Sequence, residues 1–221
     1  MIYDPNDPLI RKEIEFKLKS EYSVENIINR IKTELDNYYI EGPEKYFEKR
    51  PKPGVGMFSF HGDSEYFTAD DYFRSYFTMG KCNVFAYIIY KVFEGYATAY
   101  SDGGISNIGD HIIVKVGNKF YDYNGEIKVD DKQEFINDGQ YSIKGKIFSQ
   151  YDIEHYINLY REEYKKMKNG DKPENNYVHN GDLPTEFDEE LIKIGINTGR
   201  YEIYKNVYPE IENSEVGRSS R

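Results

Sequence analysis

The chain has 221 residues and a formal net charge of −10, from 39 acidic and 29 basic side chains. Aromatic residues make up 16% of the sequence, which favours a folded domain of ordinary size over a disordered chain. A uniformly acidic chain repels phosphate backbones, so we do not expect nucleic-acid binding as the main function. The single cysteine, Cys82, excludes an internal disulfide and a cysteine-based structural zinc site.

The N-terminal segment and the hydropathy pattern predict a soluble, cytoplasmic chain. Residues 1–16 lack the basic start and apolar stretch of a signal peptide. No stretch approaches the roughly 18 consecutive apolar residues of a membrane-spanning helix, so we expect no membrane partner. Packaging into a virion is compatible with the same pattern.

The first half of the chain is expected to form two strong helices separated by a long loop. Ser23 precedes a run of apolar residues at helical spacing, and Gly95 ends a second, more apolar run that we expect to be central and buried. The expected elements are a half-buried strand (13–20), a helix (24–39), a loop with at most short strands (40–67), a short helix (69–77) and the apolar helix (82–94).

The second half is expected to be mostly strands up to residue 150 and helical after it. Gly117-Asn118 is typical of a type II′ hairpin turn, and Thr185 with Asp188 is expected to begin the last helix. The expected elements are a polar loop (102–110), a hairpin (111–124), short strands and turns (127–150), a helix (152–168), a polar linker (169–184), a helix (186–197) and a strand (200–208).

This pattern predicts an α+β fold divided near residue 168. Residues 1–168 are expected to form a single α+β domain of catalytic type with an extended N-terminal arm. Residues 169–221 are expected to form a linker, a C-terminal helical extension and a loose tail.

Cys82 is placed where a loop becomes the apolar helix. A thiol in a first helical turn lies near unpaired backbone N–H groups and the positive end of the helix dipole, which favours a nucleophilic thiolate. The same amides can bind an oxyanion. A free cysteine beside a buried helix can equally be a small packing residue, so Cys82 alone does not predict an active site.

The predicted hairpin supplies the partners that such a cysteine needs. A two-residue turn at Gly117-Asn118 would pair Ile113 with Asp122 and His111 with Asn124. His111, Asp122 and Asn124 would then project from one face, because side chains alternate along each strand. The imidazole can take the thiol proton, and either Asp122 or Asn124 can orient the ring.

The segments "GKCNVFAYIIYKVF" and "DHIIVKVGNKFYDYNGE" resemble the core of papain-like and transglutaminase-like cysteine hydrolases, especially compact phage and bacterial versions. The resemblance covers about residues 78–126. It implies Cys82 as nucleophile, His111 as general base and Asp122 as the orienting acid, with Asn124 in reserve. It also implies a central buried helix that carries the cysteine, packed on a small antiparallel sheet with peripheral helices.

The resemblance implies a hydrolase or acyl transferase that acts on an amide, isopeptide or ester bond of a protein or peptide substrate. No metal or organic cofactor is expected, and nothing in the sequence chooses between water and an amine as acceptor. No Gln precedes the cysteine, so Thr78, Asn83 or the Cys82 amide is expected to bind the oxyanion. The alternative is a non-catalytic virion or interaction protein that keeps the same fold and binds protein assembly partners.

Overall fold

The computed structural model describes residues 24–41, 56–60, 63–67, 77–78, 81–103, 111–128, 134–136, 139–170 and 184–207. The helices are α2 (Val24–Glu41), α4 (Cys82–Val92), α5 (Ile153–Lys168) and α6 (Glu186–Val207). The strands are β1 (Gly56–Phe60), β2 (Asp63–Phe67), β3 (Ala97–Ser101), β4 (Ile112–Val116), β5 (Lys119–Asp122), β6 (Gly125–Ile127), β7 (Glu134–Phe135), β8 (Tyr141–Ile143) and β9 (Lys146–Gln150). The fold is therefore α+β, as the sequence predicts.

The strand expected over residues 13–20 and most of the short helix expected over 69–77 lie outside the described residues. No helix within the described part of the chain is long and apolar enough to span a membrane.

Seven of the strands form one antiparallel sheet in the order β6-β5-β4-β3-β9-β8-β7, while β1 and β2 pair with each other. Alternate side chains of this sheet enter two different apolar clusters, as expected when both faces are covered. Ile112 and Val114 of β4 belong to the large core that the helices share. Ile113 faces the other way, into a smaller cluster with Phe120 and Phe148.

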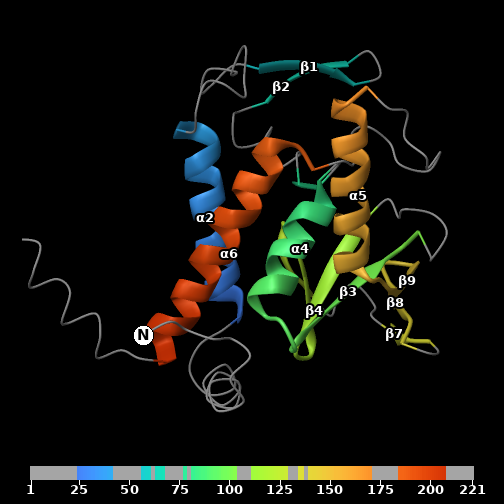
Figure 1. The fold of residues 1–221 in the computed structure, drawn as a ribbon. Helices are drawn as coiled ribbons and strands as arrows, with labels where there is room; N and C mark the ends of the chain where they lie inside the picture. Colours follow the sequence, from blue (N-terminus) through green and yellow to red (C-terminus); the bar gives the residue numbers. More distant parts are fainter. Residues whose placement is uncertain are drawn as a thin grey trace, which may run out of the picture.

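Helix α4 occupies the centre of the molecule (Figure 1), with α6 on one side, α5 on the other and β3 and β4 behind it. Eight of its eleven residues are buried, which agrees with the expected central helix. A helix that is apolar over most of its circumference is stable only when neighbours cover it on several sides. Cys82, its first residue, packs against the same large core.

The β4–β5 hairpin has the predicted register, with Val116 paired with Lys119 and Val114 paired with Tyr121. Gly117 has φ +62°, and Lys144 is the only described residue other than glycine with a positive φ. Positive φ at the first central position alone is the type II′ signature, so Gly117-Asn118 forms the expected turn.

Helix α6 runs to Val207, so the predicted end near residue 197 and the predicted strand over 200–208 are wrong. Gly199 lies inside the helix because it is a contact point. A Cβ atom added there would lie 2.5 Å from Cγ2 of Val92 and 2.8 Å from Cδ1 of Ile31. Gly195, one turn earlier, meets Ile88 in the same way at 2.6 Å. The two glycines let α6 approach both α4 and α2 closely, and α6 residues enter the shared core.

Candidate active site

Cys82 is the first residue of α4 and is half-buried against the core. The carbonyl of Lys81 accepts hydrogen bonds from the amides of Val84 and Phe85, which close the first helical turn. The Cys82 amide precedes that turn, where helical N–H groups have no intrahelical acceptor. No acidic residue lies in the first turn of α4, so the helix dipole at the thiol is not offset by a carboxylate of that turn.

A buried ion pair holds the start of α4. The Nζ atom of Lys81 lies 3.0 Å from Oδ2 of Asp188, and the two side chains are 9% and 0% exposed. Asp188 also accepts hydrogen bonds from the backbone amide and hydroxyl of Thr185, which confirms the predicted start of α6. The C-terminal helix is thereby joined to the residue that precedes the cysteine.

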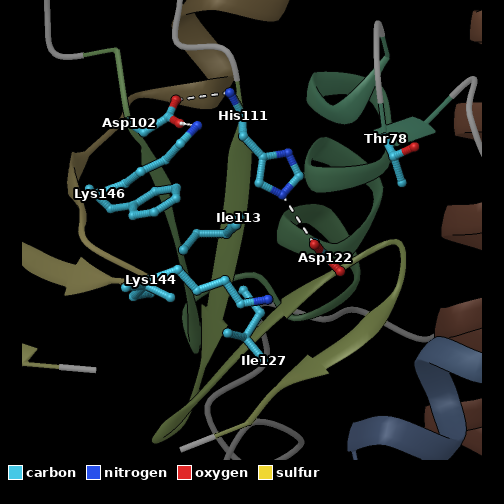
Figure 2. A pocket seen from close by; sticks show the side chains of 10 residues that line it. Thr78, Asp102, His111, Ile113, Asp122, Ile127, Lys144 and Lys146 are labelled. Atoms are coloured by element: carbon cyan, nitrogen blue, oxygen red, sulfur yellow. Dashed lines mark hydrogen bonds and ion pairs between the residues drawn. The ribbon is translucent and has the colours of Figure 1, made fainter. Parts of the chain in front are cut away.

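His111 and Asp122 contact each other as the hairpin register predicts. Nε2 of His111 lies 3.1 Å from Oδ2 of Asp122, and both side chains are largely buried (Figure 2). The other Asp122 oxygen accepts the backbone N–H of Asn124 at 2.7 Å. With Nε2 directed to Asp122, Nδ1 is the ring nitrogen left for the thiol, and the nearby Cys82 side chain contributes to the raised pKa of His111.

The charges of this group support one another. The hydrogen bond with Asp122, and after it the interaction with Cys82, raises the pKa of His111 to about 9 against the opposing effect of burial. Burial raises the pKa of Asp122, but the His111 hydrogen bond and charge outweigh it and leave that pKa below its ordinary value. The imidazole is therefore protonated at neutral pH and faces a carboxylate.

Asn124 does not lie opposite His111, which corrects the predicted pairing at the end of the hairpin. Strand β5 ends at Asp122, which pairs with Gly125 of β6. Asn124 therefore falls in the turn between β5 and β6 and is exposed. Its backbone supports the Asp122 carboxylate.

Asp102 is a supporting residue that the sequence does not reveal. Its Oδ1 accepts the backbone N–H of His111 at 2.9 Å, and its own N–H donates to the His111 carbonyl at 3.3 Å. Its Oδ2 accepts from Nζ of Lys146 at 2.9 Å, and the Asp102 side chain is only 6% exposed. Asp102 and His111 are separated by a polar loop, so no local pattern indicates this contact.

Tyr151 is a second neighbour that sequence reasoning misses, because it is one of 23 tyrosines. Burial, followed by the nearby Tyr160 and more weakly by Cys82, raises the pKa of Tyr151. Its phenol therefore stays protonated near the thiol. The Tyr151 ring is fixed by stacking on Tyr156, at 4.5 Å between ring centroids.

A cavity of about 360 Å³ adjoins this group (Figure 2). Its wall includes His111 and Asp122 but not Cys82. The other lining residues are Thr78, Asp102, Ile113, Ile127, Ile143, Lys144, Lys146 and Phe148. Thr78, a predicted oxyanion donor, thus lies at the cavity, whereas Asn83 is buried and its side chain accepts the Val84 amide at 2.8 Å.

In the part of the chain that the structure describes, no three or more His, Cys, Asp or Glu side chains are grouped to hold a metal ion. The chain matches no protein-family model, no curated protein and no solved structure. The arrangement of Cys82, His111 and Asp122 is therefore the basis for a functional assignment.

Proposed function

We propose that the protein is a cysteine-dependent hydrolase or acyl transferase that acts on an amide, isopeptide or ester bond. The observation that carries this proposal is the His111 imidazole, which lies 3.1 Å from the Asp122 carboxylate and whose pKa is raised by Asp122 and, after it, by the Cys82 side chain. A nucleophile, a proton carrier and an orienting carboxylate in this order are the components of acyl transfer through a covalent intermediate. The papain-like and transglutaminase-like resemblance of residues 78–126 supports the same reaction class.

In the first half-reaction, His111 already carries the proton, and the Cys82 sulfur attacks the substrate carbonyl carbon as a thiolate. A C–S bond forms, and the carbonyl π electrons move to the oxygen. When this tetrahedral intermediate collapses, the bond to the leaving nitrogen or oxygen breaks and His111 gives that atom its proton. The raised pKa of His111 keeps the proton available for this step at neutral pH.

In the second half-reaction, neutral His111 takes a proton from water or an amine as that molecule attacks the thioester. The C–S bond breaks, and the product is a carboxylic acid or a new amide. Asp122 stabilises the imidazolium that forms again, because its carboxylate lies 3.1 Å from Nε2. We assign the Cys82 amide, which lies ahead of the first closed turn of α4, as the backbone donor to the oxyanion.

Alkylation of the single cysteine tests this function directly. In the folded protein, iodoacetamide should modify Cys82 at pH 6, and His111→Ala should slow that reaction by roughly tenfold or more, because the imidazolium is lost. His155→Ala is the matched control, since His155 is exposed on α5. Intact-mass spectrometry over time gives both rates. An unreactive Cys82 in folded protein, or equal rates in both variants, would contradict the proposal.

A non-catalytic binding protein is the second candidate, and one observation favours it. The cavity adjoins His111 and Asp122 but does not reach the half-buried Cys82. In that case the same residues would form a polar wall for a bound protein segment. The alkylation experiment separates the two functions, because a binding wall does not require a thiol whose reactivity depends on His111.

A further inference from the structure

The position of the cavity relative to His111 identifies which part of a substrate it can hold. A general acid must lie within hydrogen-bond distance of the atom that it protonates. In acyl transfer to Cys82 that atom belongs to the leaving group, so the leaving group lies on the His111 side of the scissile bond. The cavity borders His111 and Asp122 and excludes Cys82. It is therefore placed for the leaving group rather than for the acyl group.

Four of the side chains that line the cavity are apolar. Ile113, Ile143 and Phe148 belong to the small cluster on the sheet face opposite α4, and Ile127 packs against the same cluster. A volume of about 360 Å³ lies within the range of small-molecule sites. A single aliphatic side chain with its backbone atoms is of suitable size and polarity for this surface.

The rim of the cavity is basic, in contrast to the net charge of −10 of the whole chain. Lys144 and Lys146 enter it from the β8–β9 turn. Lys146 is turned toward Asp102, whereas the Lys144 side chain extends across the cavity toward Ile127 (Figure 2). Protonated His111 adds a third positive group, against the two carboxylates of Asp102 and Asp122.

The backbone at Lys144 gives a separate reason to assign a function to its side chain. Lys144 and Gly145 are the central residues of a two-residue turn between Ile143 and Lys146, with φ +53° and +78°. Asn-Gly is the preferred pair for such a type I′ turn, and a lysine in the left-handed region is sterically unfavourable. The turn therefore holds an ammonium group at the cavity at the expense of backbone strain.

We propose that the cavity binds the leaving group of the reaction, and that this group is an amine component with an aliphatic body and a carboxylate that contacts Lys144. An α-amino acid with a branched side chain is the simplest member of this class. The inference rests on the proposed function, because it assigns the cavity to one half of the cleaved bond. In acyl transfer, the acceptor amine would occupy the same site.

Binding of a matched pair of probes to Cys82→Ala protein tests the inference without requiring turnover. L-leucine and L-leucinamide share the ammonium group and the side chain and differ in the negative charge. Chemical shifts of isotope-labelled His111 report occupancy of the cavity and give each dissociation constant. Leucine should bind at least about fivefold more tightly than leucinamide, as expected for a charge-assisted hydrogen bond to the exposed Lys144 ammonium.

Three variants assign that preference to Lys144. Lys144→Asn should abolish it while keeping the fold, because Asn suits the left-handed turn position. Lys144→Arg should retain it, and Lys165→Gln, at an exposed position of α5, should leave it unchanged. Equal binding of the two probes, binding of neither at tens of millimolar, or a preference that persists in Lys144→Asn would each overturn the inference.

Failure here and failure of the proposed function are distinguishable. If the two probes bind equally while alkylation of Cys82 still depends on His111, the proposed hydrolase function stands and only the leaving-group assignment is overturned. A preserved preference with an inert Cys82 would overturn the leaving-group assignment and leave a carboxylate-binding cavity in a non-catalytic protein.

Discussion

The His111–Asp122 pair makes a quantitative prediction about proton binding. The perturbation is Asp122→Asn, which removes the carboxylate charge and leaves a side chain of nearly the same shape. The pKa of His111 is raised from an ordinary value of 6.5 to about 9, with Asp122 as the largest cause and Cys82 as the next. At about 1.36 kcal/mol per pKa unit, this difference corresponds to roughly 3 kcal/mol of preference for the charged imidazole. We expect Asp122→Asn to lower the pKa of His111 by at least about one unit.

The same shift sets a dependence of stability on pH. Between about pH 6.5 and pH 9 the folded protein keeps a proton on His111 that the unfolded chain releases, so this group's contribution falls as pH rises. The contribution is fully present below the unfolded pKa and is lost as pH passes through the folded value. The stability difference between wild type and Asp122→Asn should therefore be about 1–3 kcal/mol near pH 6 and much smaller at pH 10.

Nuclear magnetic resonance titration of labelled His111 measures the pKa, and urea unfolding at the two pH values measures the stability difference. The Cys82→Ala background separates the Asp122 contribution from that of the thiol. A His111 pKa at or below 6.5, or one that Asp122→Asn leaves unchanged, would refute the reasoning. A stability difference that grows with pH over this range would also refute it.

Two further predictions concern the contacts of α6. Asp188→Asn should lower the free energy of urea unfolding by about 3–5 kcal/mol, because it leaves the Lys81 ammonium buried against a neutral group. The control is Glu189→Gln, which removes the more exposed ion pair with Arg161 and should lower that free energy by under about 1 kcal/mol. Gly199→Ala should lower the thermal midpoint, since about 1–3 kcal/mol of overpacking exceeds the roughly 1 kcal/mol gained in helix propensity. Asn197→Ala, at an exposed position of the same helix, should leave the midpoint equal or higher. If Asp188→Asn and Glu189→Gln had equal effects, or Gly199→Ala and Asn197→Ala did, the result would contradict the packing described.

The parts of the structure that the sequence predicts are those set by local patterns. The period of apolar residues predicts the helix that begins at Val24, and the two-residue turn at Gly117 predicts which residues of β4 and β5 face each other. Contact between His111 and Asp122 then follows from strand geometry alone. The prediction fails at Asn124 because the next hairpin begins at Asp122, so the strand ends two residues earlier than an extension of the pattern requires.

Contacts between distant segments carry no such local signal. A glycine such as Gly199 is typical of a helix end. Here the helix continues through it, because only a small residue fits where α6 meets α4 and α2. Asp102 accepts a hydrogen bond from the His111 backbone across the loop between them. Lys81 forms an ion pair with Asp188, which is more than 100 residues later in the chain. Each of these contacts depends on how the elements pack, and local sequence patterns do not reveal that packing.

The two carboxylates beside His111 act on different parts of the residue. Asp102 fixes its backbone through two hydrogen bonds, whereas Asp122 contacts only its ring. Loss of the Asp122 charge should therefore change the proton affinity of the imidazole with little change in the position of the backbone that carries it. Loss of the Asp102 carboxylate would instead remove one of the two hydrogen bonds to the His111 backbone and the contact that holds Lys146 at the cavity rim. This division is why Asp122→Asn tests the electrostatics of the site, and why a fall in the His111 pKa in that variant cannot be attributed to displacement of the strand.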